Sequence, residues 1–113
     1  MFRLTFFLAG LALVGMSCSP CARVANAEAS VSVAGKACMG TDTTWANEKV
    51  SRCETGLSKC SADDLKFMAQ YADCLLKISA CTSSTGFSYL AARAGCLADG
   101  ALKISPTCFA AIQ

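Results

Sequence analysis

The sequence predicts a small all-α bundle held together by disulfide bonds. Polar residues recur at helical spacing along the middle of the chain, and helix-capping residues divide it into segments of helical length. Apart from the short stretch 30–33, no segment alternates between apolar and polar residues in the manner of a strand. With 113 residues and nine cysteines, the chain is expected to form one small domain with several disulfides.

The first 27 residues have the organisation of a secretory signal peptide. Arg3 supplies the positive start, and the apolar run 4–16 is shorter than the roughly 20 residues of a membrane span. The small residues Ala25-Asn26-Ala27 follow as a cleavage site. We therefore expect residues 1–27 to be removed and the mature protein to be secreted into an oxidising compartment, where cysteines form disulfides.

An alternative route of export and processing is indicated by Val14-Gly15-Met16-Ser17-Cys18, which resembles the lipoprotein box of exported bacterial proteins. The resemblance implies that Cys18 is lipidated and that the protein is a periplasmic or outer-membrane lipoprotein. Membrane association is expected only by this route. Plain cleavage after Ala27 is favoured, because Gly15 and Met16 depart from the usual box.

Residues 28–37 are small and show no helical stripe, so a flexible lead-in is predicted there. The cysteine-rich helical domain is expected to span 38–113. Its first helix is predicted to begin at Thr43 or Thr44 and to end near Gly56. One face of this helix is expected to carry Ala46, Val50, Cys53 and Leu57.

A helix from Ala62 to about Ala80, capped by Ser61, is the clearest element. Asp63 and Asp64 lie in its first turn, where the helix dipole favours acidic residues. Its exposed face is predicted from polar residues at spacings of 3, 4, 3 and 4: Asp63, Lys66, Gln70, Asp73 and Lys77. Its buried face is predicted to comprise Leu65, Phe67, Met68, Tyr71, Cys74, Leu75 and Ile78.

Two further helices are expected after the turn 82–86. The third main helix runs from about Phe87 to Asp99 and is predicted to bury Phe87, Leu90, Ala94 and Leu97. Ser105 followed by Pro106 predicts a short final helix, Pro106 to Ile112. An internal repeat of about 21 residues, in which 52–61 is echoed by 73–82, agrees with stacked helices.

Cleavage after Ala27 leaves seven cysteines, an odd number. Cys108 lies in the short final helix, so we expect it to remain a free thiol or to link two chains into a homodimer. The six disulfide candidates are Cys38, Cys53, Cys60, Cys74, Cys81 and Cys96. In an up-and-down bundle, Cys53, Cys60, Cys96 and Cys108 are expected at one end, and Cys38, Cys74 and Cys81 at the other.

A thiolate metal store is an alternative interpretation of the same cysteines. Cysteines seven residues apart share a helix face, so Cys53, Cys60, Cys74 and Cys81 could together bind Cu(I). In architecture this resembles the secreted copper-storage bundles, although their cysteines are more densely spaced. Disulfides are favoured, and no metal or cofactor is expected.

Few catalytic side chains are available, because the chain has no histidine and no glycine-rich phosphate loop. After cleavage at Ala27, eight basic residues balance eight acidic ones, which argues against nucleic acid as a partner. We therefore expect a non-enzymatic binding or structural protein that acts on an unknown macromolecular partner at the cell envelope or outside it. The alternative is a carrier of a small apolar ligand, with Met68 and its helix lining the cavity.

Overall fold

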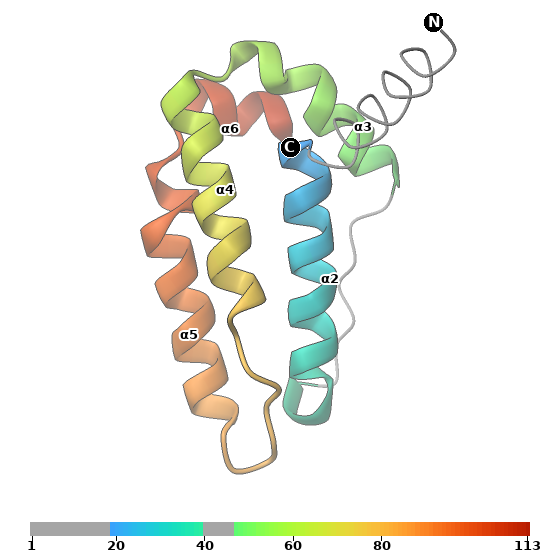
Figure 1. The fold of residues 1–113 in the computed structure, drawn as a ribbon, viewed down its shortest axis with the longest axis vertical. Helices are drawn as coiled ribbons and strands as arrows, with labels where there is room; N and C mark the ends of the chain where they lie inside the picture. Colours follow the sequence, from blue (N-terminus) through green and yellow to red (C-terminus); the bar gives the residue numbers. More distant parts are fainter. Residues whose placement is uncertain (1–18, 40–46) are drawn as a thin grey trace, which may run out of the picture.

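The computed structural model describes residues 19–39 and 47–113, and these residues confirm the all-α class (Figure 1). The described helices are α2 (Pro20–Met39), α3 (Asn47–Gly56), α4 (Ala62–Leu76), α5 (Gly86–Asp99) and α6 (Pro106–Ile112). Short 3₁₀ turns occupy Leu57–Lys59 and Ala101–Lys103. None of the described helices is both long and apolar enough to cross a membrane.

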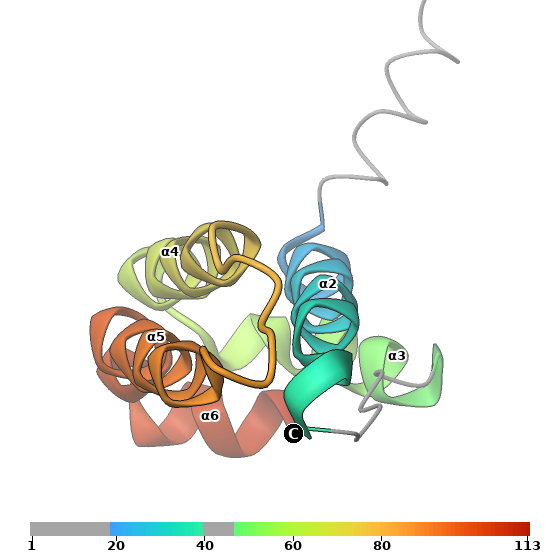
Figure 2. The same cartoon turned by 90° about the horizontal axis from the view of Figure 1, so that it is seen from below.

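The three longer helices α2, α4 and α5 run alongside one another, and α3 and α6 lie across one end of the bundle (Figures 1 and 2). The α2–α4 contact is the most extensive between two helices. The buried apolar side chains of the described residues form one core cluster. It comprises Cys21, Val24, Ala27, Val31, Cys53, Met68, Tyr71, Ala72, Leu75, Cys81, Tyr89, Cys96, Cys108 and Ile112.

Helix α2 corrects the predicted flexible lead-in, because residues 28–37 belong to one continuous helix that begins at Pro20. Its buried positions 21, 24, 27, 31 and 35 recur at spacings of three or four, and partly buried Cys38 continues the series. This stripe consists of small residues, and it crosses the expected cleavage point after Ala27. The part of α2 before Ala27 and the part after it are each too short to show the helical period when considered alone.

Helix α4 begins as predicted and ends earlier than predicted. The Ser61 side chain accepts a hydrogen bond from the Asp64 amide, and the Asp64 carboxylate accepts one from the Ser61 amide, which makes a capping box. The helix ends at Leu76 rather than Ala80. The chain beyond it is extended toward α2, where the Cys81 amide donates to the Ala34 carbonyl.

Helix α5 packs by a different face from the one predicted. Phe87, Leu90 and Leu97 were expected in the core, but they are 86%, 46% and 42% exposed, and Ala94 is exposed as well. The buried residues are Tyr89 and Cys96. Two contacts fix this face: the Tyr89 hydroxyl donates to the Val31 carbonyl at 2.8 Å, and Cys96 is disulfide-bonded to Cys74.

The predicted end of α3 and the predicted bounds of α6 are confirmed. Helix α3 ends at Gly56, and α6 has the expected bounds, with Ser105 as its N-cap and Pro106 in its first turn. The predicted start of the first helix at Thr43 or Thr44, and its Ala46, lie outside the described residues.

Candidate functional site

Four disulfides staple the helices, and each of the six candidate cysteines belongs to one of them. The Cα atoms of the pairs are 4.6–6.1 Å apart, within the range that a disulfide tolerates. The pairs are Cys21–Cys53, Cys38–Cys81, Cys60–Cys108 and Cys74–Cys96. These bonds use eight of the nine cysteines. The ninth, the lipidation candidate Cys18, lies outside the described residues.

The structure corrects the expectation that Cys108 is a free or intermolecular thiol. Cys108 is fully buried and bonded to Cys60, so α6 is tied to the turn that follows α3. The expectation followed from an odd count of seven cysteines. Cys21 changes that count to eight, because it is buried in α2 and bonded to Cys53.

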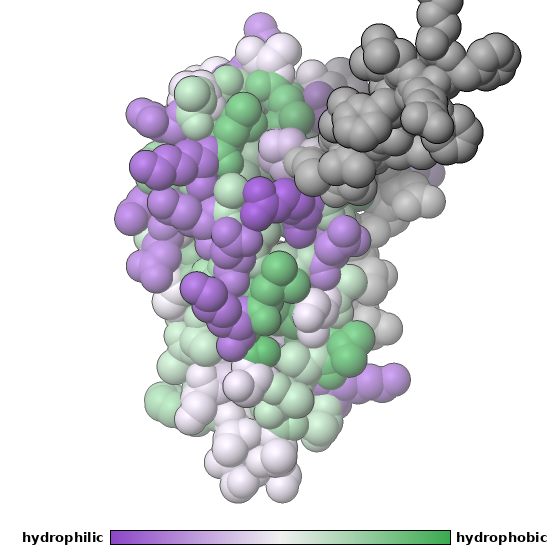
Figure 3. Space-filling model, viewed as in Figure 1, coloured by the Kyte–Doolittle hydropathy of each residue, from purple (hydrophilic) through white to green (hydrophobic). Residues whose placement is uncertain are grey.

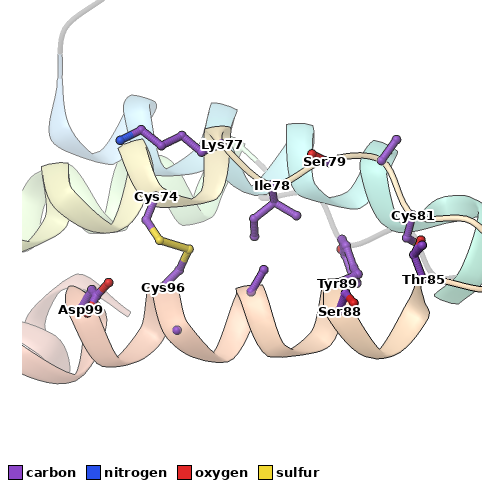
Figure 4. Close-up of a pocket in the computed structure, with 13 residues that line it drawn as sticks. Cys74, Lys77, Ile78, Ser79, Cys81, Thr85, Ser88, Tyr89, Cys96 and Asp99 are labelled. Carbon is purple, nitrogen blue, oxygen red and sulfur yellow. A yellow bond between two sulfur atoms is a disulfide. The ribbon is translucent and has the colours of Figure 1, made fainter.

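The predicted sorting of cysteines between the two ends of the bundle is partly wrong. Cys38–Cys81 and Cys60–Cys108 agree with it, whereas Cys74–Cys96 joins cysteines that were assigned to opposite ends. The cause is the early end of α4 at Leu76. The extended linker then carries the chain onward before α5 turns back, so that Cys96 lies opposite Cys74 (Figure 4).

The cysteines do not form the shared thiolate cluster that the metal-storage alternative requires, because Cys53, Cys60, Cys74 and Cys81 belong to four different disulfides. Among the described residues, one group brings ligand-type atoms within 4.8 Å of one another: Cys60, Asp64 and Cys108. The two sulfurs are bonded to each other, and the Asp64 carboxylate already accepts hydrogen bonds from Ser61 and Ser105.

Asp64 is therefore a structural carboxylate rather than half of an acidic pair. Hydrogen bonds from the backbone amides of Ser105 and Ser61 lower its pKa to about 2, against a modest opposing effect of burial. The neighbouring Asp63 is exposed, as expected for adjacent helical residues that point in different directions. The two carboxylates therefore lie in different surroundings, one bonded to two helix caps and one exposed.

A second polar network joins α2, α4 and α5. The Tyr71 hydroxyl donates to one Glu28 carboxylate oxygen at 2.5 Å, and Arg93 approaches the other oxygen at 3.6 Å. Burial, followed by the bond to this carboxylate, raises the pKa of Tyr71 above its usual range. The phenol stays protonated, which suits a helix-bridging donor.

A groove runs between the end of α4, the following linker and α5 (Figure 4). Its volume of about 620 Å³ lies within the range of small-molecule sites. The Cys74–Cys96 disulfide closes one part of it, and Ile78 points from the linker toward α5. The α5 wall is made of residues with small or short side chains, together with buried Tyr89: Ser88, Ala92, Gly95 and Asp99.

Sequence reasoning missed this groove and placed a ligand cavity around Met68. Met68 is 1% exposed and belongs to the core, and it does not line the groove. The available signal was the recurrence of small or polar residues at 88, 92, 95 and 99, a helical period within α5. The opposite wall is an extended linker, which no helical pattern predicts.

Next to the groove, α5 carries an exposed apolar stripe, the surface made of Phe87, Leu90, Ala91, Ala94, Leu97 and Ala98. These positions recur at spacings of three, one, three, three and one, which places them on one helix face. The chain from Ile78 to Ala92 contains no charged residue. In Figure 3, hydrophilic side chains likewise gather on the upper half of the visible face, and the lower half is mostly white and pale green.

Comparison with known proteins gives no match to a family model, a curated protein or a solved structure. What the fold and its site define is therefore a class, a small all-α bundle stapled by four disulfides.

Proposed function

We propose that this chain is an exported, non-enzymatic binding protein that acts through the α5 side of its bundle on another macromolecule at the cell envelope or outside the cell. The observation that carries the proposal is the exposed apolar stripe of α5. Phe87 is 86% exposed, although the same helix has a separate face that packs the core. A contiguous exposed apolar surface is typical of an interaction site.

The disulfides support the compartment. Four intramolecular bonds in a small domain are typical of an oxidising environment outside the cytosol. They also support a binding role, because a stapled scaffold holds the exposed α5 surface in one conformation. A rigid surface loses less conformational entropy when it binds a partner.

We propose a non-enzymatic role because of how the titratable groups are placed. The chain has no histidine, and the groups with shifted pKa values make helix-capping and helix-bridging contacts: Asp64 bonds Ser61 and Ser105, and Tyr71 bonds Glu28. The groove contains Lys77 and Asp99 at one end and no nucleophile paired with a base among its lining residues. The near balance of charge argues against nucleic acid as the partner.

Capture of the partner with a variant of the stripe tests the proposal. Immobilised native protein and the double variant Phe87→Ser/Leu90→Ser are each exposed to the envelope and medium of the producing organism, and bound proteins are quantified by mass spectrometry. Leu76→Ser is the matched control, because Leu76 is exposed on α4 and lies outside the groove and the stripe. We expect a partner that the native protein and the control capture equally and that the double variant loses. Equal capture by all three proteins contradicts the proposal.

The groove favours a second candidate function, the carrier of a small apolar ligand. Its lining includes Ile78, Ala92 and Tyr89, and its size suits a lipid-like molecule. Organic extraction of native protein, followed by mass spectrometry, tests this candidate. Gly95→Leu, which places a large side chain in the groove, is expected to lower the recovered ligand severalfold. Recovery of no stoichiometric ligand from the native protein contradicts it.

A further inference from the structure

We propose that export processing cuts the chain on the N-terminal side of Pro20, at the Ser17–Cys18 bond, and not after Ala27. The reaction is hydrolysis of one peptide bond by water, catalysed by the signal peptidase of the exporting cell. The inference rests on residues 20–27, which the fold uses as part of its core, and it does not depend on what α5 binds.

Residues 20–27 supply three of the buried side chains of α2. Cys21 and Ala27 are fully buried, and Val24 is 4% exposed. Removing this stretch shortens the helix by about 12 Å, at 1.5 Å per residue. It also removes part of the most extensive helix–helix contact in the fold, between α2 and α4. A cleaved leader is expected to be dispensable for the mature core, and this segment is not.

The same stretch carries bonds to two other helices. Cys21 forms a disulfide with Cys53 of α3, and Arg23 forms an ion pair with Asp73 of α4 at 2.9 Å. Cleavage after Ala27 breaks both connections and leaves Cys53, which is fully buried in the intact fold, as a thiol without its partner. It also places a charged amino terminus on Glu28, whose carboxylate accepts the partly buried hydrogen bond from Tyr71.

The earlier junction removes none of these contacts. A chain that begins at Cys18 keeps Cys21, and eight cysteines close the four observed disulfides. Val14-Gly15-Met16-Ser17-Cys18 lies between the apolar run of the leader and the first residue of α2. Small Ser17 next to the cut suits a signal peptidase. The fold thus favours cleavage at Ser17–Cys18, whereas the sequence motif Ala25-Asn26-Ala27 favours cleavage after Ala27.

Intact mass of the exported protein tests the cut. The full chain with its own leader is produced in an exporting host, recovered from envelope and medium without reductant, and its N-terminal peptide is sequenced. We expect a chain that begins at Cys18 and contains four disulfides. A diacylglyceryl adduct on Cys18 and a bare Cys18 both support the cut, because they differ only in anchorage. A chain that begins at Glu28 with one free thiol overturns the proposal.

Two substitutions keep the test independent of protein yield. Ser17→Arg disrupts the earlier junction and is expected to cause at least a tenfold accumulation of the unprocessed chain. Ala25→Glu disrupts the later motif at a partly exposed position of α2, and it is expected to leave the cut site unchanged. Accumulation of precursor with Ala25→Glu, together with normal processing of Ser17→Arg, overturns the proposal.

Discussion

The Asp64 carboxylate accepts two hydrogen bonds from Ser105, one from the backbone amide and one from the hydroxyl, each at 2.9 Å. Ser105 caps α6, and Asp64 completes the capping box of α4 with Ser61. Asp64 and Ser105 are 41 residues apart in the chain, so one buried carboxylate bonds the caps of two helices that are distant in sequence.

This carboxylate predicts a loss of stability in acid. The folded pKa of Asp64 is about 2, below its ordinary value of 3.8, so its contribution is complete above about pH 4 and is lost as the pH falls toward 2. Thermal unfolding followed by circular dichroism should show a Tm that decreases over this range. Asp64→Asn should have a lower Tm at pH 7 and a flatter acid dependence. Asp63→Asn, in the same turn and exposed, is the control; an identical response in both variants contradicts the prediction.

Two glycines of the α5 region should respond in opposite directions to alanine. A Cβ on Gly100 lies 2.7 Å from the Tyr71 Cβ and 2.9 Å from the Phe67 carbonyl oxygen, so neighbouring backbone must shift. Gly100→Ala should cost about 1–3 kcal/mol in urea unfolding. A Cβ on Gly95 meets nothing within 4 Å, so Gly95→Ala should stabilise α5 by about 0.5–1 kcal/mol. A shared sign for the two changes argues against the packing of α5 described above.

The orientation of α5 predicts unequal costs for its two aromatic residues. Tyr89 is 4% exposed and bonds Val31, so Tyr89→Ala should lower the unfolding free energy by about 3 kcal/mol or more. Phe87→Ala removes an exposed side chain and should change it by less than about 0.5 kcal/mol. Denaturant titrations of the two variants measure the difference. A larger cost for Phe87→Ala than for Tyr89→Ala would contradict this orientation and support the helix face predicted from the sequence.

Cys108→Ser should create a free thiol rather than remove one. The substitution breaks the bond to Cys60 and should cost about 2–4 kcal/mol of stability. Alkylation without reductant, followed by peptide mapping, should label Cys60, and disulfide-linked dimer should increase. The double variant Cys60→Ser/Cys108→Ser is the control, which should lose the label and the additional dimer. Labelling of Cys108 in the native protein contradicts the pairing.

Local chemistry in the sequence is sufficient to predict the fold class, the start of α4 and both ends of α6. Ser61 with its acidic first turn sets the start of α4, and Ser105 with Pro106 sets α6, because a cap and its first turn depend only on neighbouring residues. The polar residues of α4 recur at spacings that hold one face in water, and all five are exposed. These features needed no knowledge of the other helices.

The site depended on tertiary structure. Helix α5 has two faces apolar enough to be buried, and the choice was made by partners far along the chain, Val31 for Tyr89 and Cys74 for Cys96. The groove arises because α4 stops at Leu76 where the Cys81 region bonds α2. The small-residue stripe of α2 becomes a core face only against α4, since its helical period crosses the expected cleavage point. Caps and periodicity are local properties, whereas the burial of one apolar face over another, and the pairing of cysteines, are set by which helices pack together.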